Sequence, residues 1–241
     1  MALITQTDEI AKRYGLEAIP ESVRRLGMLV SRQDACTDEV AKLICQDKEL
    51  TARLLRVANP KAETEADYMI TTVAAALQRS GMGSALLLAM HVPLVQAVQK
   101  TFHTMLGAEL TMRPSAVLPS WGEHILCEIA FKGKASGSAA LRMPQMSALQ
   151  VAASVLDMPP ADLGDAAIID DVIGELSNMM VGNFKSNLCD AGLKCTLSTP
   201  SITRTSDRQL RSVSGSLGER IAFHAPDLDI MIDLNVNPWG E

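Results

Sequence analysis

The spacing of apolar residues changes partway along this 241-residue chain, and that change constrains the fold most. In residues 1–90 apolar side chains recur at helical intervals, as Val23, Leu26 and Val30 do, and no alternating run occurs. From His124 onward the interval becomes two, as in a half-buried strand. The first alternating positions are Ile125, Cys127, Ile129 and Phe131.

The predicted elements form two groups. We expect helices over residues 22–31, 50–58, 71–79, 93–106, 144–156 and 165–188, and another capped by Asp38. We expect five or six antiparallel strands, including 124–131, 135–143, 192–199, 211–223 and 228–236. Gly81 should close the fourth helix, and Pro93 suits the first turn of the next. Helices followed by an antiparallel sheet predict an α+β chain of two modules, residues 1–90 and 91–241.

Composition excludes several classes of partner and setting. The net charge is −6 and neither half is basic, which argues against nucleic acid, because such binding needs clustered Lys and Arg. Five cysteines without a CxxC motif are typical of reduced thiols in a cytoplasmic protein. The longest apolar stretch, residues 85–95, is interrupted by His91 and too short to span a bilayer. We therefore expect a cytoplasmic protein with no membrane partner.

One stripe of the expected helix 165–188 combines groups that could do chemistry. At about 100° per residue its members project to one side, while apolar residues such as Ile173 and Phe184 project to the other. A carboxylate and an amide lie one turn apart on it, beside a glycine without a side chain to keep a partner away. Taken alone, such a stripe is more often a solvated face. Its members are Asp171, Glu175, Asn178, Gly182 and Lys185.

The first module resembles the HDOD domain. Residues 47–59 read D-K-E-L-T-A-R-L-L-R-V-A-N, close to that family's D-P-x-L-T-A-R-L-L-R-x-A-N, with Lys48 where proline is usual. The resemblance covers about 90 residues, less than half of a full HDOD domain. HDOD domains are similar to metal-dependent HD phosphohydrolases but lack the ligands, and residues 1–90 contain no histidine. The module is therefore either a regulatory platform or a helical cap on its neighbour.

The second module resembles the CheX/CheC family of chemotaxis phosphatases. The helix motif E-x-x-N-M-x-x-G-x-x-K, starting at Glu175, and the strand at residues 192–200 look like that family's active-site helix and following strand. The hairpin pattern G-x-x-x-G-x-x-x-L-x-M, starting at Gly133, also matches. The sequence departs at residues 202–205, where a valine–glycine step is usual. The resemblance implies an α+β domain with an antiparallel sheet packed on long helices.

The resemblance also implies a reaction and a partner. The substrate would be the phospho-aspartate of a CheY-like response regulator, with Asn178 positioning the attacking water and Glu175 pairing with the regulator's lysine. Asp171, Gly182 and Lys185 would contact the regulator, which brings its own Mg²⁺, so no metal or cofactor is expected on this chain. Family members are often dimers through their sheets, which suggests a homodimer. The alternative is a non-catalytic adaptor that only recognises the phosphorylated regulator.

Overall fold

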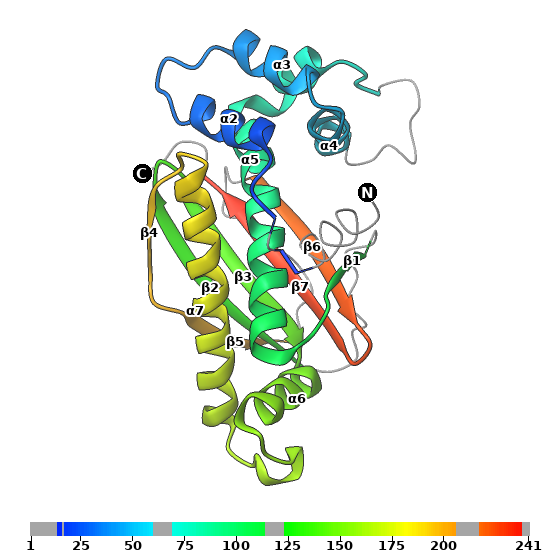
Figure 1. Ribbon diagram of the computed structural model, residues 1–241, viewed down its shortest axis with the longest axis vertical. Coiled ribbons are helices and arrows are strands. Elements are labelled where there is room, and N and C mark those ends of the chain that lie inside the picture. The colour runs from blue at the N-terminus through cyan, green and yellow to red at the C-terminus, as the bar shows by residue number, and fades with distance from the viewer. Residues whose placement is uncertain (1–13, 16, 60–68, 114–122, 206–216, 238–241) are drawn as a thin grey trace, which may run out of the picture.

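A computed structural model describes residues 14–15, 17–59, 69–113, 123–205 and 217–237. The expected order is confirmed: helices come first and an antiparallel sheet follows (Figure 1). The N-terminal helices are α2 (Glu21–Val30), α3 (Thr37–Cys45) and α4 (Lys48–Ala58). The long helix α5 (Val73–Leu106) leads into the sheet region, which also contains α6 (Gln145–Leu156) and α7 (Ala166–Asp190).

The sheet has seven strands among the described residues, in the order β1-β6-β7-β3-β2-β4, with β5 also paired to β2. All of the pairings are antiparallel. The strands are β1 (Thr111–Arg113), β2 (His124–Gly133), β3 (Gly137–Pro144), β4 (Cys195–Leu197), β5 (Ser201–Thr205), β6 (Leu217–Ala225) and β7 (Leu228–Val236). The expectation of five or six strands was wrong because it missed the short edge strands β1 and β5.

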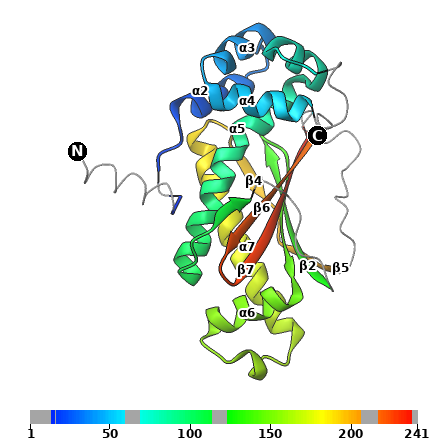
Figure 2. The same ribbon diagram turned by 90° about the vertical axis from the view of Figure 1, so that its right-hand side faces the viewer.

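Helices α5 and α7 lie side by side over one face of this sheet (Figures 1 and 2). Alternate residues of the central strands point towards them, including Leu141 of β3 and Ile232 of β7, which face each other across the pairing. The other face of β7 carries Asp233, which is also buried and pairs with Arg220 at 2.7 Å and Arg142 at 3.4 Å. Residues on both faces of β7 are therefore buried.

Helix α5 replaces the two helices that we expected over residues 71–79 and 93–106. Gly81 does interrupt the helical backbone, with φ 71° and ψ −179°, but the chain resumes the helix at once. Pro93 therefore lies inside a helix and not in its first turn, which corrects our prediction. Packing explains the exception, because residues 83–91 and most of the next turns are buried. The module boundary expected near residue 90 falls within this helix.

The N-terminal helices α2, α3 and α4 pack on the first part of α5 (Figure 2). Asp47 caps α4 by accepting hydrogen bonds from the backbone N–H of Glu49 at 2.8 Å and Leu50 at 3.1 Å. The cap expected at Asp38 was wrong, since α3 begins at Thr37 and its N-cap is Cys36, two residues earlier. Asp38 instead lies in the first turn, where a carboxylate still stabilises the helix dipole.

Helix α2 also contacts the far end of α7. A Cβ atom added to Gly27 would lie 2.5 Å from the backbone oxygen of Ala191, just after α7 ends. Only glycine allows the two segments to approach this closely. The N-terminal helices therefore contact the α+β domain through α2, in addition to packing on α5.

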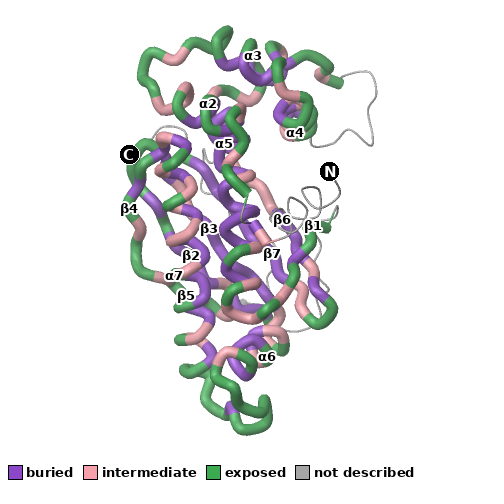
Figure 3. Tube along the Cα trace, in the orientation of Figure 1, coloured by how far each residue is buried: buried purple, intermediate pink, exposed green. Residues whose placement is uncertain are grey.

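The buried residues form one continuous core, concentrated where α5 and the central strands meet (Figure 3). By length and composition α5 could cross a membrane, and it is the one such helix in the described part of the chain. However, 83% of its most apolar window is buried inside the fold. That burial is typical of the core helix of a soluble protein.

Candidate functional site

Helix α7 carries the candidate site and is fixed at its start by three polar contacts. The side chain of Asp165 caps it by accepting from the backbone N–H of Ala167 at 2.9 Å. Arg204 of β5 pairs with Asp170 at 2.6 Å and donates to the oxygen of Ala166 at 3.3 Å. Arg204 belongs to the segment that departs from the family pattern. Here that segment forms an edge strand and anchors the site helix.

Two amides fix the rotation of α7. Asn183 donates to the hydroxyl of Thr101 at 2.9 Å, and Asn187 donates to the backbone oxygen of Pro93 at 2.9 Å, both on α5. Ser177 is buried and donates to the oxygen of Ile173 at 2.7 Å within the helix. The two amide contacts hold one side of α7 against α5, and the opposite side faces solvent.

The solvent-facing side holds the predicted stripe. Asp171, Glu175 and Asn178 are all exposed, as expected for residues that meet a partner. Within the described part of the chain, none of the three makes a hydrogen bond or an ion pair. Glu175 and Asn178 are three residues apart on one helix, so their Cβ atoms are about 5–6 Å apart. The Glu175 carboxylate and the Asn178 carboxamide are thus exposed side by side, and both can form hydrogen bonds with a partner.

Gly182 and Lys185 continue the stripe towards the C-terminal end of α7, where both are half-buried. A Cβ atom added to Gly182 would meet nothing within 4 Å, so the backbone there is open to an approaching molecule. From Asp171 to Lys185 the stripe extends over about 21 Å of helix. That length suits a protein surface better than a small molecule.

The site holds no constellation for metal chemistry among the residues that the structure describes. No group of three or more His, Cys, Asp or Glu side chains there is placed to hold a metal ion. Arg204 neutralises Asp170 next to the stripe, which leaves Asp171 and Glu175 as its unpaired carboxylates. What α7 can do by itself is form hydrogen bonds and ion pairs with a partner.

A second polar cluster was missed by the sequence analysis, which considered His91 only as an interruption of an apolar stretch. Arg53 of α4 donates to one oxygen of Glu219 on β6 at 2.7 Å. His91 Nδ1 of α5 lies 2.9 Å from the other oxygen and 2.7 Å from Arg53. It donates to the carboxylate in one tautomer and accepts from the guanidinium in the other. Arg53 and Glu219 are 166 residues apart, so no local pattern could reveal the cluster.

Burial and charge perturb both titratable members of this cluster. Burial lowers the pKa of His91 below its ordinary 6.5, and this outweighs the opposing effect of Glu219. For Glu219, burial raises the pKa, but the hydrogen bond and charge of His91 and the charges of Arg53 and Arg56 outweigh it and lower the pKa. At neutral pH the cluster is therefore an ion pair between Arg53 and Glu219 with a neutral imidazole beside it.

Comparison with known families and structures agrees with this architecture. The family model described as the chemotaxis phosphatase CheX matches residues 125–224, and the HDOD domain model matches residues 16–156, more than half of the chain. The two matches overlap over residues 125–156. A comparison with curated protein sequences found no match.

Two solved structures share the fold. A chemotaxis protein CheX from Desulfovibrio desulfuricans is 20% identical, with 61% of this chain and 98% of that one covered and a TM-score of 0.51. The chemotaxis protein CheX from Vibrio vulnificus is also 20% identical, with 60% and 94% covered and a TM-score of 0.52. At that identity the likeness concerns the fold alone. The chain therefore belongs to the HDOD family, and its α+β domain has a CheX-like fold that the CheX family model matches over residues 125–224.

Proposed function

We propose that this protein is a signalling phosphatase that removes the phosphoryl group from the phospho-aspartate of a CheY-type response regulator. The observation that most supports the proposal is the pair Glu175 and Asn178, exposed one turn apart on α7 without partners in the described chain. The match to a family model described as a chemotaxis phosphatase points to the same reaction.

The reaction needs little from this chain. An acyl phosphate already has a good leaving group, and the regulator supplies Mg²⁺ and a lysine that neutralise the phosphoryl oxygens. What remains is a water molecule held in line with the breaking bond, and positioning of this kind is the main contribution of proteins to phosphoryl transfer. The carboxamide of Asn178 holds that water by hydrogen bonds without having to titrate. The water's oxygen bonds to phosphorus, the bond between phosphorus and the aspartyl oxygen breaks, and the products are inorganic phosphate and the free aspartate carboxylate.

The other members of the stripe dock the regulator. Glu175 pairs with the regulator's active-site lysine, and this charge-assisted contact sets the register of α7 in the regulator's site. Gly182 lets the regulator's backbone approach α7, since no side chain fills the space above it. Asp171 and Lys185 contact the regulator at the two ends of the stripe. In this scheme the Mg²⁺ belongs to the regulator and this chain holds no cofactor.

The test is a time course of phosphate release from an acyl-phosphorylated CheY-type regulator. Asn178→Ala should slow release by about 10²–10³-fold, as does removal of a group that positions or stabilises the reacting atoms. Its affinity for the beryllofluoride-treated regulator should stay near wild type, because the amide contacts the water more than the protein. Glu175→Ala should instead weaken binding by about 2–5 kcal/mol, as expected when one partner of a buried interfacial charge pair is removed.

Gln150→Ala is the matched control, since it removes an exposed carboxamide from α6, away from the stripe. It should match wild type in both assays. If the wild-type protein binds the activated regulator but releases no more phosphate than the regulator alone, the protein is a non-catalytic adaptor. If Asn178→Ala is fully active, the water-positioning role is wrong.

The proposed partner also sets the location. Response regulators act in the cytoplasm, and the burial of most of α5 suits a protein that works there. A homodimer formed through the sheets stays a prediction, which sedimentation of the purified chain would test.

A further inference from the structure

The N-terminal helices contain a groove that the phosphatase mechanism does not use. It measures about 450 Å³ and lies between α2 and α3. We call it the α2–α3 groove. Its lining residues are Arg25, Met28, Leu29, Arg32, Glu39, Lys42, Leu43 and Gln46.

The lining consists of one stripe from each helix. From α2 it comprises residues 25, 28 and 29, with Arg32 two residues past the end of the helix. From α3 it comprises residues 39, 42 and 43, with Gln46 as the C-cap. Within each helix the three residues have the spacing i, i+3, i+4, so they share one helix face. Two such faces with apolar residues between charged ones are typical of a groove that receives a third helix.

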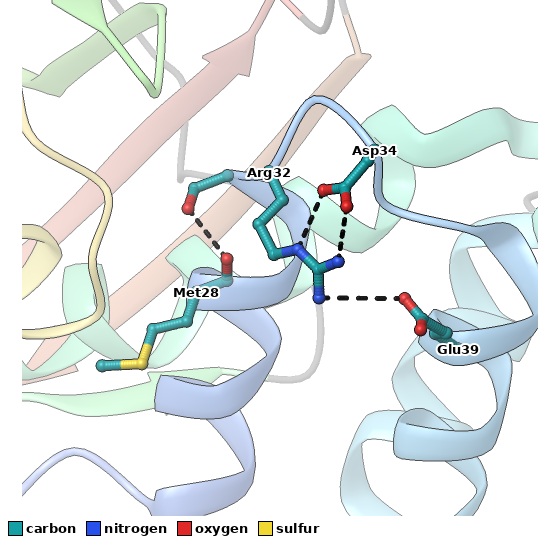
Figure 4. Close-up of polar contacts among 5 residues, drawn as sticks. Met28, Arg32, Asp34 and Glu39 are labelled. Atoms are coloured by element: carbon teal, nitrogen blue, oxygen red, sulfur yellow. Dashed lines mark hydrogen bonds and ion pairs between the residues drawn. The ribbon is translucent and has the colours of Figure 1, made fainter.

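The charges of the groove favour an acidic occupant. Three of its residues are basic and one is acidic, whereas the whole chain has a net charge of −6. Arg32 is held by Asp34 at 2.7 Å and by Glu39 at 4.0 Å (Figure 4). Arg25 and Lys42 are exposed and have no ion-pair partner within the described residues. Two free cations thus flank an apolar floor on a protein that is otherwise acidic.

The groove adjoins the end of the phosphatase helix. Met28 lines the groove, and its side chain points towards the segment that follows α7 (Figure 4). A Cβ atom added to Gly192 would lie 3.1 Å from Met28 Cγ, so the two segments are in contact. Helix α2 also lies on the same side of the sheet as α5 and α7 (Figures 1 and 2).

A bound regulator is large enough to reach this edge. Asp190, the last residue of α7, lies about 18 Å along the helix axis from Asn178. A receiver domain of about 120 residues has a radius of gyration of about 14 Å, and therefore a radius of about 17–18 Å. A regulator centred over Asn178 thus extends to the end of α7. Met28, which lines the groove, lies beside that end.

We infer that the α2–α3 groove is a second docking surface for the same response regulator, and that it receives an exposed acidic helix of that protein. The inference rests on the proposed function of α7. It gives the HDOD-like segment a role in selecting the regulator. Helix α7 acts on the phosphoryl group, and the groove binds the regulator's surface next to that site. Charges at the rim of an interface act mainly on the association rate and on specificity.

The test compares two double variants of the full-length chain with the same change in net charge. Arg25→Glu/Lys42→Glu reverses the free cations of the groove. Arg24→Glu/Lys48→Glu reverses exposed cations of α2 and α4 outside it. Association of a beryllofluoride-activated CheY-type regulator is measured for each by stopped flow, at low and physiological salt. All four positions are exposed, so both variants should keep the wild-type unfolding midpoint.

The groove variant should bind about tenfold more weakly, mainly through slower association and with a weaker dependence on salt. The control variant should stay within about twofold of wild type. Phosphate release at saturating regulator should be unchanged in both, because Asn178 is intact. Equal binding by the two variants overturns the inference and leaves the function of α7 standing. A change in the sedimentation of the groove variant without a change in regulator binding also overturns it, since the occupant is then a second copy. If the wild type does not bind the regulator at all, the proposed function fails as well.

Discussion

Replacing Glu219 by glutamine tests what holds the N-terminal helices to the sheet. Glu219 on β6 is the acceptor shared by Arg53 of α4 and His91 of α5, at 2.7 and 2.9 Å. Glutamine keeps the length and volume of the side chain, so the change isolates the charge. Arg53 is then left largely buried opposite a neutral amide.

The size of the effect follows from how deeply the pair is buried. Removing one partner of a fully buried ion pair costs about 3–5 kcal/mol, and losing a hydrogen bond to a charged group costs about 1.5–3 kcal/mol. The side chains of Arg53 and Glu219 are 23% and 21% exposed, so water screens part of the loss. We expect the free energy of unfolding to fall by about 2 kcal/mol. In a chain of this size that lowers Tm by about 4–8 °C.

Thermal unfolding followed by circular dichroism at pH 7.5 measures this change. Glu21→Gln is the matched control, since Glu21 pairs with Arg24 at 3.0 Å but the two side chains are 66% and 46% exposed. It should not shift Tm measurably. In Arg53→Met/Glu219→Gln the second substitution should cost much less than it does alone, because its partner is already absent. A Tm for Glu219→Gln equal to that of the control, or strictly additive effects in the double variant, would refute the reasoning.

Two further predictions concern stability. The folded chain lowers the pKa of His91, so as pH falls through 6.5 the unfolded chain takes up a proton at His91 before the folded chain does. The urea midpoint should therefore drop between pH 7.5 and 5.5, and it should drop less in His91→Gln. Equal drops in the two proteins would contradict this. Gly27→Ala should lower the free energy of unfolding by about 1–3 kcal/mol, because its Cβ would lie 2.5 Å from a backbone oxygen. The same change at Gly182, where the space is open, should raise it by about 0.5–1 kcal/mol, and a stabilised Gly27→Ala would disprove the close packing.

The parts of this fold that local spacing controls could be predicted from the sequence. The type of most elements followed from apolar periodicity, and the exposure of Glu175 and Asn178 followed from the helical stripe they share. Asp165 caps α7, where the helix was expected to begin. In each case the residues that decide the structure are neighbours along the chain, so their spacing contains the information.

The parts decided by distant contacts could not be predicted. Pro93 predicts the start of a helix, but it lies inside α5. The packing of α5 against α7 and the sheet outweighs the cost of the backbone N–H that proline lacks. Strand β5 has five residues and depends on pairing with β2 and on the contact of Arg204 with Asp170. The Arg53–Glu219 pair joins residues far apart in sequence, and nothing near either one indicates the other.

The continuity of α5 determines how this protein can be divided. Its first turns bury side chains such as Val73 and Leu77 under the N-terminal helices, and its later turns bury Leu94 and Phe102 beneath the α+β domain. A break anywhere between residues 73 and 106 therefore divides the continuous core and exposes part of it. Neither half is then a complete folding unit, so we expect the whole chain to unfold in one cooperative transition.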